Sequence, residues 1–259
     1  MLEPTERMID SGAIEIRDRL GLISGGRILD VGTYEGGFIS TLMKCLKDYQ
    51  SFIGIDIEEE YLEKAREEFK NDPAEFQVMD AENLSFSDNS FDTVSISHSF
   101  HHLKNIDSVL SEIKRVLKPG GHLIIQEMFC DGKQSESQKT DIMIHHWDAE
   151  VDSLRDIPHY KTFTRQKLND TVAEIGMNNV ETFESNRYVK CLFCSDILEC
   201  EDPKNEDLIK VSLREIDKIL ENSKDTPVFD RMNETAVTLR ARLNQTGSSS
   251  ASLLFFICN

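Results

Sequence analysis

The 259-residue sequence predicts an α/β fold in which a parallel sheet carries helices on both faces. Short apolar segments alternate with amphipathic segments whose apolar residues recur at the helical period. In the clearest unit an apolar strand, Ile28–Val31, leads into a turn that holds Gly32 and Gly36, and a helix is predicted from Phe38 to Lys47. This order is typical of a site where a ligand approaches the backbone and the N–H groups of a helix N-terminus.

The other elements follow in chain order. A helix is predicted over Ile9–Leu20. Further strands are predicted at Ser51–Ile57, Glu75–Met79, Phe91–Ser97 and His122–Glu127, with helices at Glu58–Asn71 and Ile106–Leu117; Lys118–Gly121 ends the second helix. After a polar segment, Cys130–Tyr160, a helix at Arg165–Ile175, a strand at Asn179–Ser185, helices at Glu206–Asn222 and Arg231–Leu243 and a last buried strand at Ala251–Cys258 are predicted.

The composition excludes some classes of partner. The formal net charge is -18 and the isoelectric point is near 4.8, so the surface repels phosphate backbones and anionic lipid. No apolar run approaches the roughly 20 residues that span a bilayer, and we expect no signal peptide at the N-terminus. The six cysteines are thinly spread and indicate reduced thiols. We therefore expect a cytoplasmic protein that binds a small molecule and neither nucleic acid nor membrane.

Four segments, in order, resemble one family. They are ILDVGTYEGG, FIGIDIEEEYLEKARE, FQVMDAENLSFSDNSFDTVSISHSFHHL and EIKRVLKPGGHLIIQE, within residues 28–127. This stretch resembles the core of a class I S-adenosylmethionine-dependent methyltransferase of the ubiquinone/menaquinone-biosynthesis type. The resemblance implies a doubly wound, Rossmann-like sheet of seven strands, mainly parallel, with the last strand antiparallel beside the fifth. It implies one methyltransferase domain over residues 1–259, with a core of 22–190 plus 250–258 and a helical lid, 191–247, that offers a surface for a homodimer.

The resemblance also implies a cofactor, S-adenosylmethionine, and a set of residues that bind it. The turn would face the methionine end of the cofactor, and Asp30 would attract its ammonium group. A carboxylate has two acceptor oxygens, so Asp56 suits the two ribose hydroxyls, although it could also cap the next helix. Asp80 would accept from the adenine amino group, unless it only forms a turn. The full predicted set is Asp30, Gly32, Thr33, Tyr34, Gly36, Asp56, Ile57, Asp80, Ala81, Glu82, Ser97 and His98.

One position departs from the family pattern. The turn commonly reads Gly-x-Gly-x-Gly, and Tyr34 stands at its middle glycine. Because a tyrosine does not relax into positive φ as glycine does, either the turn keeps φ negative there or the ring lines the pocket.

Candidate catalytic residues are histidines. His98 ends a strand where ligands sit in open parallel sheets, so it is the first candidate for a general base. His145 and His146, with His159, come next, in a segment where Trp147 and Tyr160 could stack on a substrate; a surface helix with inward aromatics explains that segment equally well. Among His98, His101 and His102, the first and the last could share one face of a helix, but no carboxylate or third ligand is evident beside them. No metal site is predicted.

Three other interpretations stay open. The thiols Cys191, Cys194 and Cys200 could bind a soft metalloid acceptor, or could be small buried hydrophobes. A nicotinamide-dependent oxidoreductase would need Gly-x-Gly-x-x-Gly, whereas this chain has Gly-x-x-x-Gly-Gly. A non-catalytic protein could keep the three aspartates and bind the cofactor without turnover.

Overall fold

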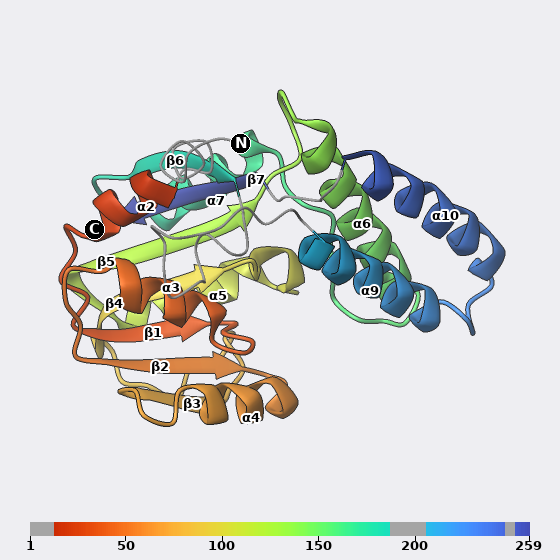
Figure 1. Ribbon diagram of the computed structural model, residues 1–259. Helices are drawn as coiled ribbons and strands as arrows, with labels where there is room; N and C mark the ends of the chain where they lie inside the picture. Colours follow the sequence, from red (N-terminus) through yellow and green to blue (C-terminus); the bar gives the residue numbers. More distant parts are fainter. Residues whose placement is uncertain (1–12, 187–205, 247–251) are drawn as a thin grey trace. The chain divides into compact units, whose positions relative to one another are not determined.

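The computed structural model describes residues 13–186, 206–246 and 252–259. The described residues fall into two compact units. The sheet unit holds those within residues 12–127, 166–185 and 254–259. The helical unit holds those within 128–165 and 186–253 (Figure 1). No helix in the described ranges is both long and apolar enough to cross a membrane.

A seven-stranded sheet has the order β3-β2-β1-β4-β5-β7-β6. The strands are β1 (Arg27–Val31), β2 (Ser51–Asp56), β3 (Ala74–Val78), β4 (Phe91–Ser97), β5 (Leu117–Met128), β6 (Glu181–Asn186) and β7 (Ser252–Cys258). β1 pairs in parallel with β2 and β4, β2 with β3, and β4 with β5. Asp30 stands opposite Gly54 on one side and Ser95 on the other.

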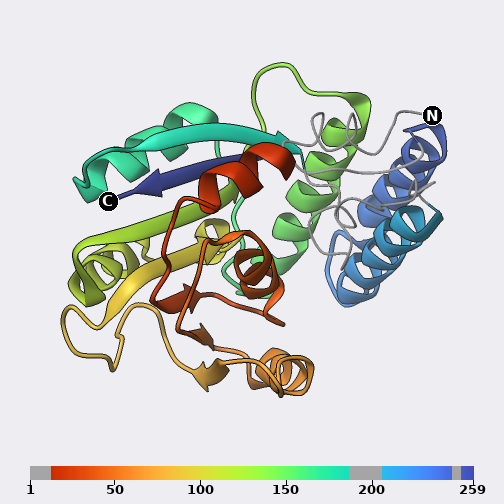
Figure 2. The same ribbon diagram turned by 60° about the vertical axis from the view of Figure 1, so that its left-hand side comes forward.

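The last strand lies between β5 and β6. Phe129, just after β5, donates its N–H to the carbonyl of Ser252 at the start of β7. Asn178, before β6, and Asn259, after β7, exchange two backbone hydrogen bonds. The end of one strand therefore meets the start of its neighbour, and Figure 2 shows β7 running opposite to β6. The predicted antiparallel last strand is confirmed.

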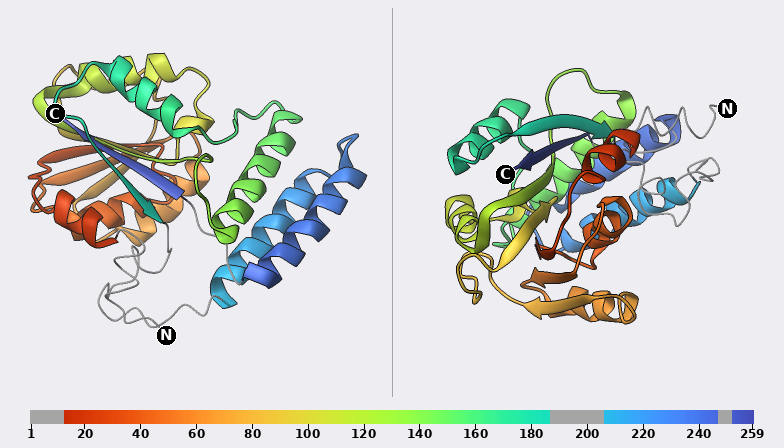
Figure 3. Two further views of the ribbon diagram at one scale, coloured as in Figure 1. Left: turned by 90° about the horizontal axis from the view of Figure 1, so that it is seen from above. Right: turned by 90° about the vertical axis from the view of Figure 1, so that its left-hand side faces the viewer.

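Helices cover both faces of the sheet. They are α2 (Ala13–Leu20), α3 (Gly37–Cys45), α4 (Glu59–Glu68), α5 (Ile106–Val116) and α7 (Arg165–Ile175). Figure 3 shows α5 and α7 on one face and α2 and α3 on the other. The core between these layers is aliphatic and aromatic, with Phe52, Phe91 and Phe255 fully buried. The predicted doubly wound arrangement is confirmed.

The prediction for the fifth strand was too short. Lys118–Gly121 does not stand outside the sheet, because β5 begins at Leu117, which pairs with Phe91 across a register shift. Asp92 lies at the irregularity: its carboxylate accepts from Lys118 Nζ at 2.7 Å and from the N–H of Arg27 at 2.9 Å. A side chain thus ties the irregular start of β5 to β1.

The helical unit is built from α6 (Glu136–Ser153), α9 (Glu206–Asn222) and α10 (Phe229–Thr246), which lie side by side (Figure 3). The sequence had indicated only a polar segment where α6 lies. Its buried residues lie on two opposite faces, with 140, 144, 147 and 151 on one and 142 and 149 on the other, so no single apolar stripe marks the helical period. A capping box of Ser135 and Gln138 begins it.

Candidate cofactor site at the carboxyl ends of the strands

The turn after β1 depends on backbone that only small residues adopt easily. Gly32 and Gly36 have φ of +65° and +85°. A Cβ on Gly32 would lie 2.4 Å from the hydroxyl of Ser99, and one on Gly36 would lie 2.5 Å from the ring of Phe69. Both positions therefore require glycine for conformation and for space.

Tyr34, between these glycines, adopts φ of +53°, so the alternative of a negative φ is wrong. The ring compensates for this strain by packing on Tyr61, with centroids 4.1 Å apart. Half of the residue stays exposed (49%). Partial burial, with the charge of Glu35 next, raises the pKa of the Tyr34 phenol.

Asp30 lies beneath the turn and is almost completely buried. Its Oδ2 accepts from Thr33 Oγ1 at 2.7 Å and its Oδ1 from Ser95 Oγ at 2.6 Å. Burial raises the pKa of this carboxyl to about 6, against the lowering effect of the two hydroxyls, and the charge of Asp56 adds a smaller increase. Both oxygens thus serve the scaffold of the turn, and a direct role for Asp30 in binding an ammonium group stays a prediction.

Asp56 connects the end of β2 to the turn. Its Oδ2 accepts from the N–H of Tyr34 at 2.9 Å, and its Oδ1 accepts from the N–H of Glu58 at 3.1 Å. The carboxylate therefore closes a short turn just before α4, whose N-cap is Glu58 without a side-chain cap bond, and it orients the glycine turn at the same time. Each oxygen has two lone pairs, so both can still accept from a pair of ligand hydroxyls. Ile57 beside it is 66% exposed, as a side chain that covers a flat ligand would be.

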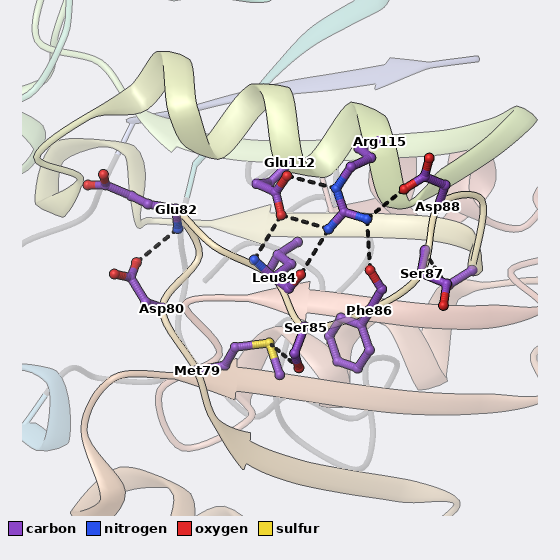
Figure 4. Close-up of polar contacts among 11 residues, drawn as sticks. Met79, Asp80, Glu82, Leu84, Ser85, Phe86, Ser87, Asp88, Glu112 and Arg115 are labelled. Carbon is purple, nitrogen blue, oxygen red and sulfur yellow. Dashed lines mark hydrogen bonds and ion pairs between the residues drawn. The ribbon is translucent and has the colours of Figure 1, made fainter.

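The loop after β3 carries Asp80, Ala81 and Glu82. Asp80 Oδ1 accepts from the N–H of Glu82 at 2.9 Å, and the N–H of Met79 donates to the carbonyl of Asp56 at 2.9 Å. These bonds place Asp80 beside the end of β2 and fix its carboxylate as the cap of a short turn (Figure 4).

The rest of this loop is held by a charged pair on α5 that the sequence prediction missed. Arg115 donates to the carbonyls of Leu84 and Phe86, at 2.9 and 2.8 Å, and binds both oxygens of Glu112 (Figure 4). Glu112 in turn accepts from the N–H of Leu84 at 2.8 Å. The i,i+3 spacing of a Glu and an Arg was the available signal, but it did not show what the pair would bind.

The end of β4 presents Ser97 and His98. Ser97 Oγ donates to Gln126 Oε1 at 2.6 Å, and the N–H of His98 donates to the carbonyl of Gln126 at 2.9 Å. His98 is half-buried and has φ of +52°, a second strained residue at this edge. Ser99, which follows, donates to the carbonyl of Ser97 and packs on Gly32. Ser99, whose hydroxyl also contacts the carbonyl of Gly32, thus joins the ends of β1 and β4, whereas Ser97 joins β4 to β5.

The next histidine, His101, is buried and pairs with a buried carboxylate. His101 is 1% exposed, and its Nδ1 lies 2.9 Å from Oε1 of Glu127, which is also buried. The other oxygen of Glu127 accepts from the N–H of Phe100 at 2.8 Å. His101 therefore orders the short 3-10 turn Phe100–His102, and Glu127 is a site-supporting residue that the sequence prediction did not name.

The remaining catalytic candidates belong to the helical unit. His146 Nε2 lies 2.7 Å from Thr162 Oγ1, and burial, with Lys161 next, lowers the pKa of its imidazole. His145 and His159 face each other, with their Nε2 atoms 3.3 Å apart. Trp147 lies in the core of α6, α9 and α10 instead of on a surface, whereas Tyr160 is 51% exposed. The alternative in which the tryptophan packs inward describes the structure.

Some residues named in the sequence predictions lie outside the described residues. They are Cys191, Cys194 and Cys200, part of the predicted lid, and residues 9–12 of the predicted first helix. Among the described residues, Cys45, Cys130 and Cys258 are free thiols. Burial raises the pKa of Cys45 and of Cys258 to about 11, so neither is a reactive thiolate at neutral pH.

Comparison with known sequences identifies the central segment. Residues 29–125 match the family model described as "Methyltransferase domain". Over 106 residues the chain is 37% identical to a demethylmenaquinone methyltransferase of Bacteroides fragilis, covering 39% of this chain and 43% of the relative. Over 99 residues it is 35% identical to the ubiquinone/menaquinone biosynthesis C-methyltransferase UbiE of Desulfotalea psychrophila, covering 38% and 40%. The match thus spans less than half of these curated relatives.

Solved structures share the fold at lower identity. Phosphoethanolamine N-methyltransferase 2 of Haemonchus contortus, in complex with S-adenosyl-L-methionine, has a TM-score of 0.55 and 22% identity, over 95% of this chain and 51% of that one. A SAM dependent methyltransferase from Aquifex aeolicus has a TM-score of 0.50 and 20% identity, over 71% and 94%.

Residues 29–125 therefore resemble a methyltransferase domain, and solved methyltransferase structures share the fold of this chain. The sequence relatives of the matched part include quinone methyltransferases, among them UbiE. The activity of the whole chain is a proposal, because these matches span less than half of the chain and less than half of the relatives.

Proposed function

We propose that this protein transfers the methyl group of S-adenosylmethionine to a small-molecule acceptor. The observation that carries this proposal is Asp56, whose carboxylate closes β2 and also accepts from the N–H of Tyr34 in the glycine turn. Asp56 thus holds its own two acceptor oxygens beside a turn whose backbone N–H groups can bind the carboxylate of a ligand. This combination suits a ligand with a ribose diol and an amino-acid end.

The residues fit the parts of the cofactor. The Gly32–Gly36 turn would receive the methionine end, Asp56 the ribose, and Asp80 with Ala81 and Glu82 the adenine, which Ile57 would cover. Asp30 and Thr33 support the turn from below. When bound, the cofactor supplies a methyl group on a sulfonium, which is already a good leaving group, so the chain must mainly orient the acceptor in line and exclude water.

His98 is the residue we propose to face the reaction. It ends β4 at the edge where the bound sulfonium would lie, and its backbone is strained, as functional residues often are. An acceptor that loses a proton, such as a phenol, needs a base there; a carbon acceptor of the quinol type, which the names of the UbiE relatives suggest, needs ring deprotonation as well. His145 and His146 are the further candidates, in the helical unit.

Calorimetry and a product assay test the proposal. We expect the protein to bind S-adenosylmethionine and S-adenosylhomocysteine but not NADH. We also expect release of S-adenosylhomocysteine with one of a panel of quinols, phenols, amines and thiols. Binding of NADH alone would favour the oxidoreductase, and binding without turnover on any acceptor class would favour a non-catalytic binder.

The finer properties are also proposals. We propose that the protein works in the cytoplasm, binds neither nucleic acid nor membrane, and forms a homodimer through the segment 191–247. The thinly spread cysteines support the location, the net charge of -18 supports the absence of nucleic-acid and membrane binding, and the 61% exposed Val237 on α10 supports a contact surface. Sedimentation at two concentrations tests the dimer, and a monomer at both would reject it.

A further inference from the structure

A cluster of titratable side chains in the helical unit includes no residue of the predicted cofactor set, although it contains His145, one of the catalytic candidates. His145, Asp148 and Asp152 stand on α6 at spacings of three and four residues, so they share one face of the helix. His159 comes from the segment after the helix. Its residue is only 5% exposed, and the side chain of Asp152 is 16% exposed.

The donor atoms in this cluster are close together. His159 Nδ1 lies 2.9 Å from Asp152 Oδ2, and its Nε2 lies 3.3 Å from His145 Nε2. One candidate ligand atom from each of Asp148, Asp152 and His159 lies within 4.8 Å of the others. Ligands that are neighbours around a dication, with bonds of about 2.0–2.2 Å, are about 3 Å apart, so His159 and Asp152 already have the required spacing.

Two carboxylates of the cluster lie close together. A ligand oxygen of Asp148 comes within 4.8 Å of one of Asp152, and the side chain of Asp152 is only 16% exposed. The guanidinium of Arg155, 3.6 Å from Asp152, is a cation beside the pair. Two neighbouring carboxylates that are partly shielded from water repel each other, and a dication between them would relieve that repulsion.

We propose that Asp148, Asp152 and His159 bind a divalent transition-metal cation, of which Zn²⁺ and Mn²⁺ are the best matches. Two carboxylates and an imidazole are a mixed oxygen and nitrogen set, which suits these ions better than Ca²⁺ or Mg²⁺. His145 would orient the ring of His159 from its far nitrogen. Bound through Nδ1 as a neutral ligand, the ring of His159 would carry its proton on Nε2 and donate it in a hydrogen bond to Nε2 of His145.

The role of such an ion would be to join α6 to the segment that follows it. Ligands at 148 and 152 are separated by one helical turn, and His159 lies beyond the helix end at Ser153. The cation would therefore fix the path of residues 154–159. The ion would not take part in methyl transfer, so the result of a metal-binding test does not depend on which acceptor the protein methylates.

Metal titration tests the proposal on the full chain. Protein dialysed against a chelator is titrated calorimetrically with Zn²⁺ and with Mn²⁺, and thermal unfolding is followed with and without each ion. We expect one equivalent of at least one of the two ions to bind with a Kd at or below the micromolar range. We also expect Tm to rise by several degrees at saturation. The proposal would be overturned if neither ion bound stoichiometrically with a Kd of about 100 μM or lower, which is 100-fold weaker than expected.

Variants assign the ligands. Asp148→Asn, Asp152→Asn and His159→Ala should each weaken binding at least tenfold. Glu150→Gln is the matched control, because it makes the same charge change on the same helix, where its carboxylate pairs with Arg231, and it should bind as the wild type does. Asp148→Asn should keep or raise the metal-free Tm, because it removes a repelled carboxylate, so a loss of binding there does not come from unfolding.

A spectroscopic arm separates this site from the cysteines. Co²⁺ bound by oxygen and nitrogen shows weak visible bands only, whereas thiolate ligands add an intense charge-transfer band. Thiolate ligation of the bound ion, or undiminished binding by the double variant Asp148→Asn/Asp152→Asn, would place the ion elsewhere and refute the assignment.

Discussion

The carboxyl edge of the sheet and the face of α6 both gather acidic and imidazole groups, but they fix them in different ways. At the sheet edge, Asp30 lies near the end of β1, Asp56 ends β2 and Asp80 follows β3, so strand pairing alone sets their order. On α6, the positions of His145 and Asp152 depend on how the helix is packed. The comparison teaches that cofactor recognition is a property of backbone topology, whereas the side chains of the helical unit are set by packing.

The sequence relatives follow the same division. The matched segment, residues 29–125, includes every predicted cofactor residue and ends before the helical unit begins. The matched segment therefore holds the residues predicted to bind the cofactor, and we propose that the acceptor is determined outside it.

The largest expected effect would separate the two regions. Trp147→Ala should destabilise the helical unit by about 3–5 kcal/mol, because a buried indole in contact with Met232 is replaced by a cavity. The affinity of this variant for S-adenosylmethionine should stay within about twofold of the wild-type value. Urea unfolding and calorimetry measure the two effects. A tenfold loss of affinity with the helices still folded would mean that the regions are not separable in this way.

Asp56→Ala tests the sheet edge directly. The variant should bind S-adenosylmethionine about 100-fold more weakly, since a charged acceptor of two hydroxyls and of the Tyr34 N–H is lost. Asp56→Asn keeps one acceptor oxygen and should lose about tenfold. Glu58→Gln, an exposed neighbour, is the control and should bind normally; wild-type affinity in Asp56→Ala would refute the proposed ribose contact.

Arg115→Ala tests whether the loop after β3 needs its clamp. The change leaves the carbonyls of Leu84 and Phe86 without this donor, and we expect a loss of about 2 kcal/mol in unfolding free energy. A several-fold lower affinity for the cofactor should accompany it, because Asp80 is on the same loop. Arg115→Lys keeps the charge but not the fork, so it should recover only part of the loss.

Asp30 should make stability fall as pH rises through the window between its unfolded and folded pKa. The folded carboxyl, with its pKa near 6, holds a proton that the unfolded chain has already lost, so the folded state binds more protons between about pH 4 and 6. From pH 5.5 to 7.5 this costs about 1 kcal/mol. Asp30→Asn should remove that part of the slope in urea unfolding at the two values, and an unchanged slope would contradict the assignment.

The smallest expected effect is at Tyr34. Tyr34→Gly relieves about 1 kcal/mol of strain at positive φ but loses a ring contact with Tyr61 worth about the same. We therefore expect a net change below about 1 kcal/mol in thermal unfolding. Tyr34→Ala keeps the strain without the ring and should be the less stable of the two. A glycine variant less stable than the alanine variant would contradict this account.

The sequence predicted elements well where their period was clear. The strand Phe91–Ser97 and the helix Arg165–Ile175 were predicted with the bounds that the structure has. For the segment of α6 a helix was only one of two open alternatives, because its buried residues lie on two opposite faces. The early start of β5, where Lys118 contacts Asp92 of the neighbouring strand, was not predicted.

The residue types and spacings by themselves determined the class of fold and the residues expected to hold the cofactor, because parallel strands bring their carboxyl ends to one edge whatever the side chains do. Only the tertiary structure decided that Asp30 is buried under two hydroxyls, that Arg115 and Glu112 hold the Asp80 loop, and that His159 meets Asp152. Such contacts join residues 3 to 65 positions apart, and a chain shows them only when its segments have packed.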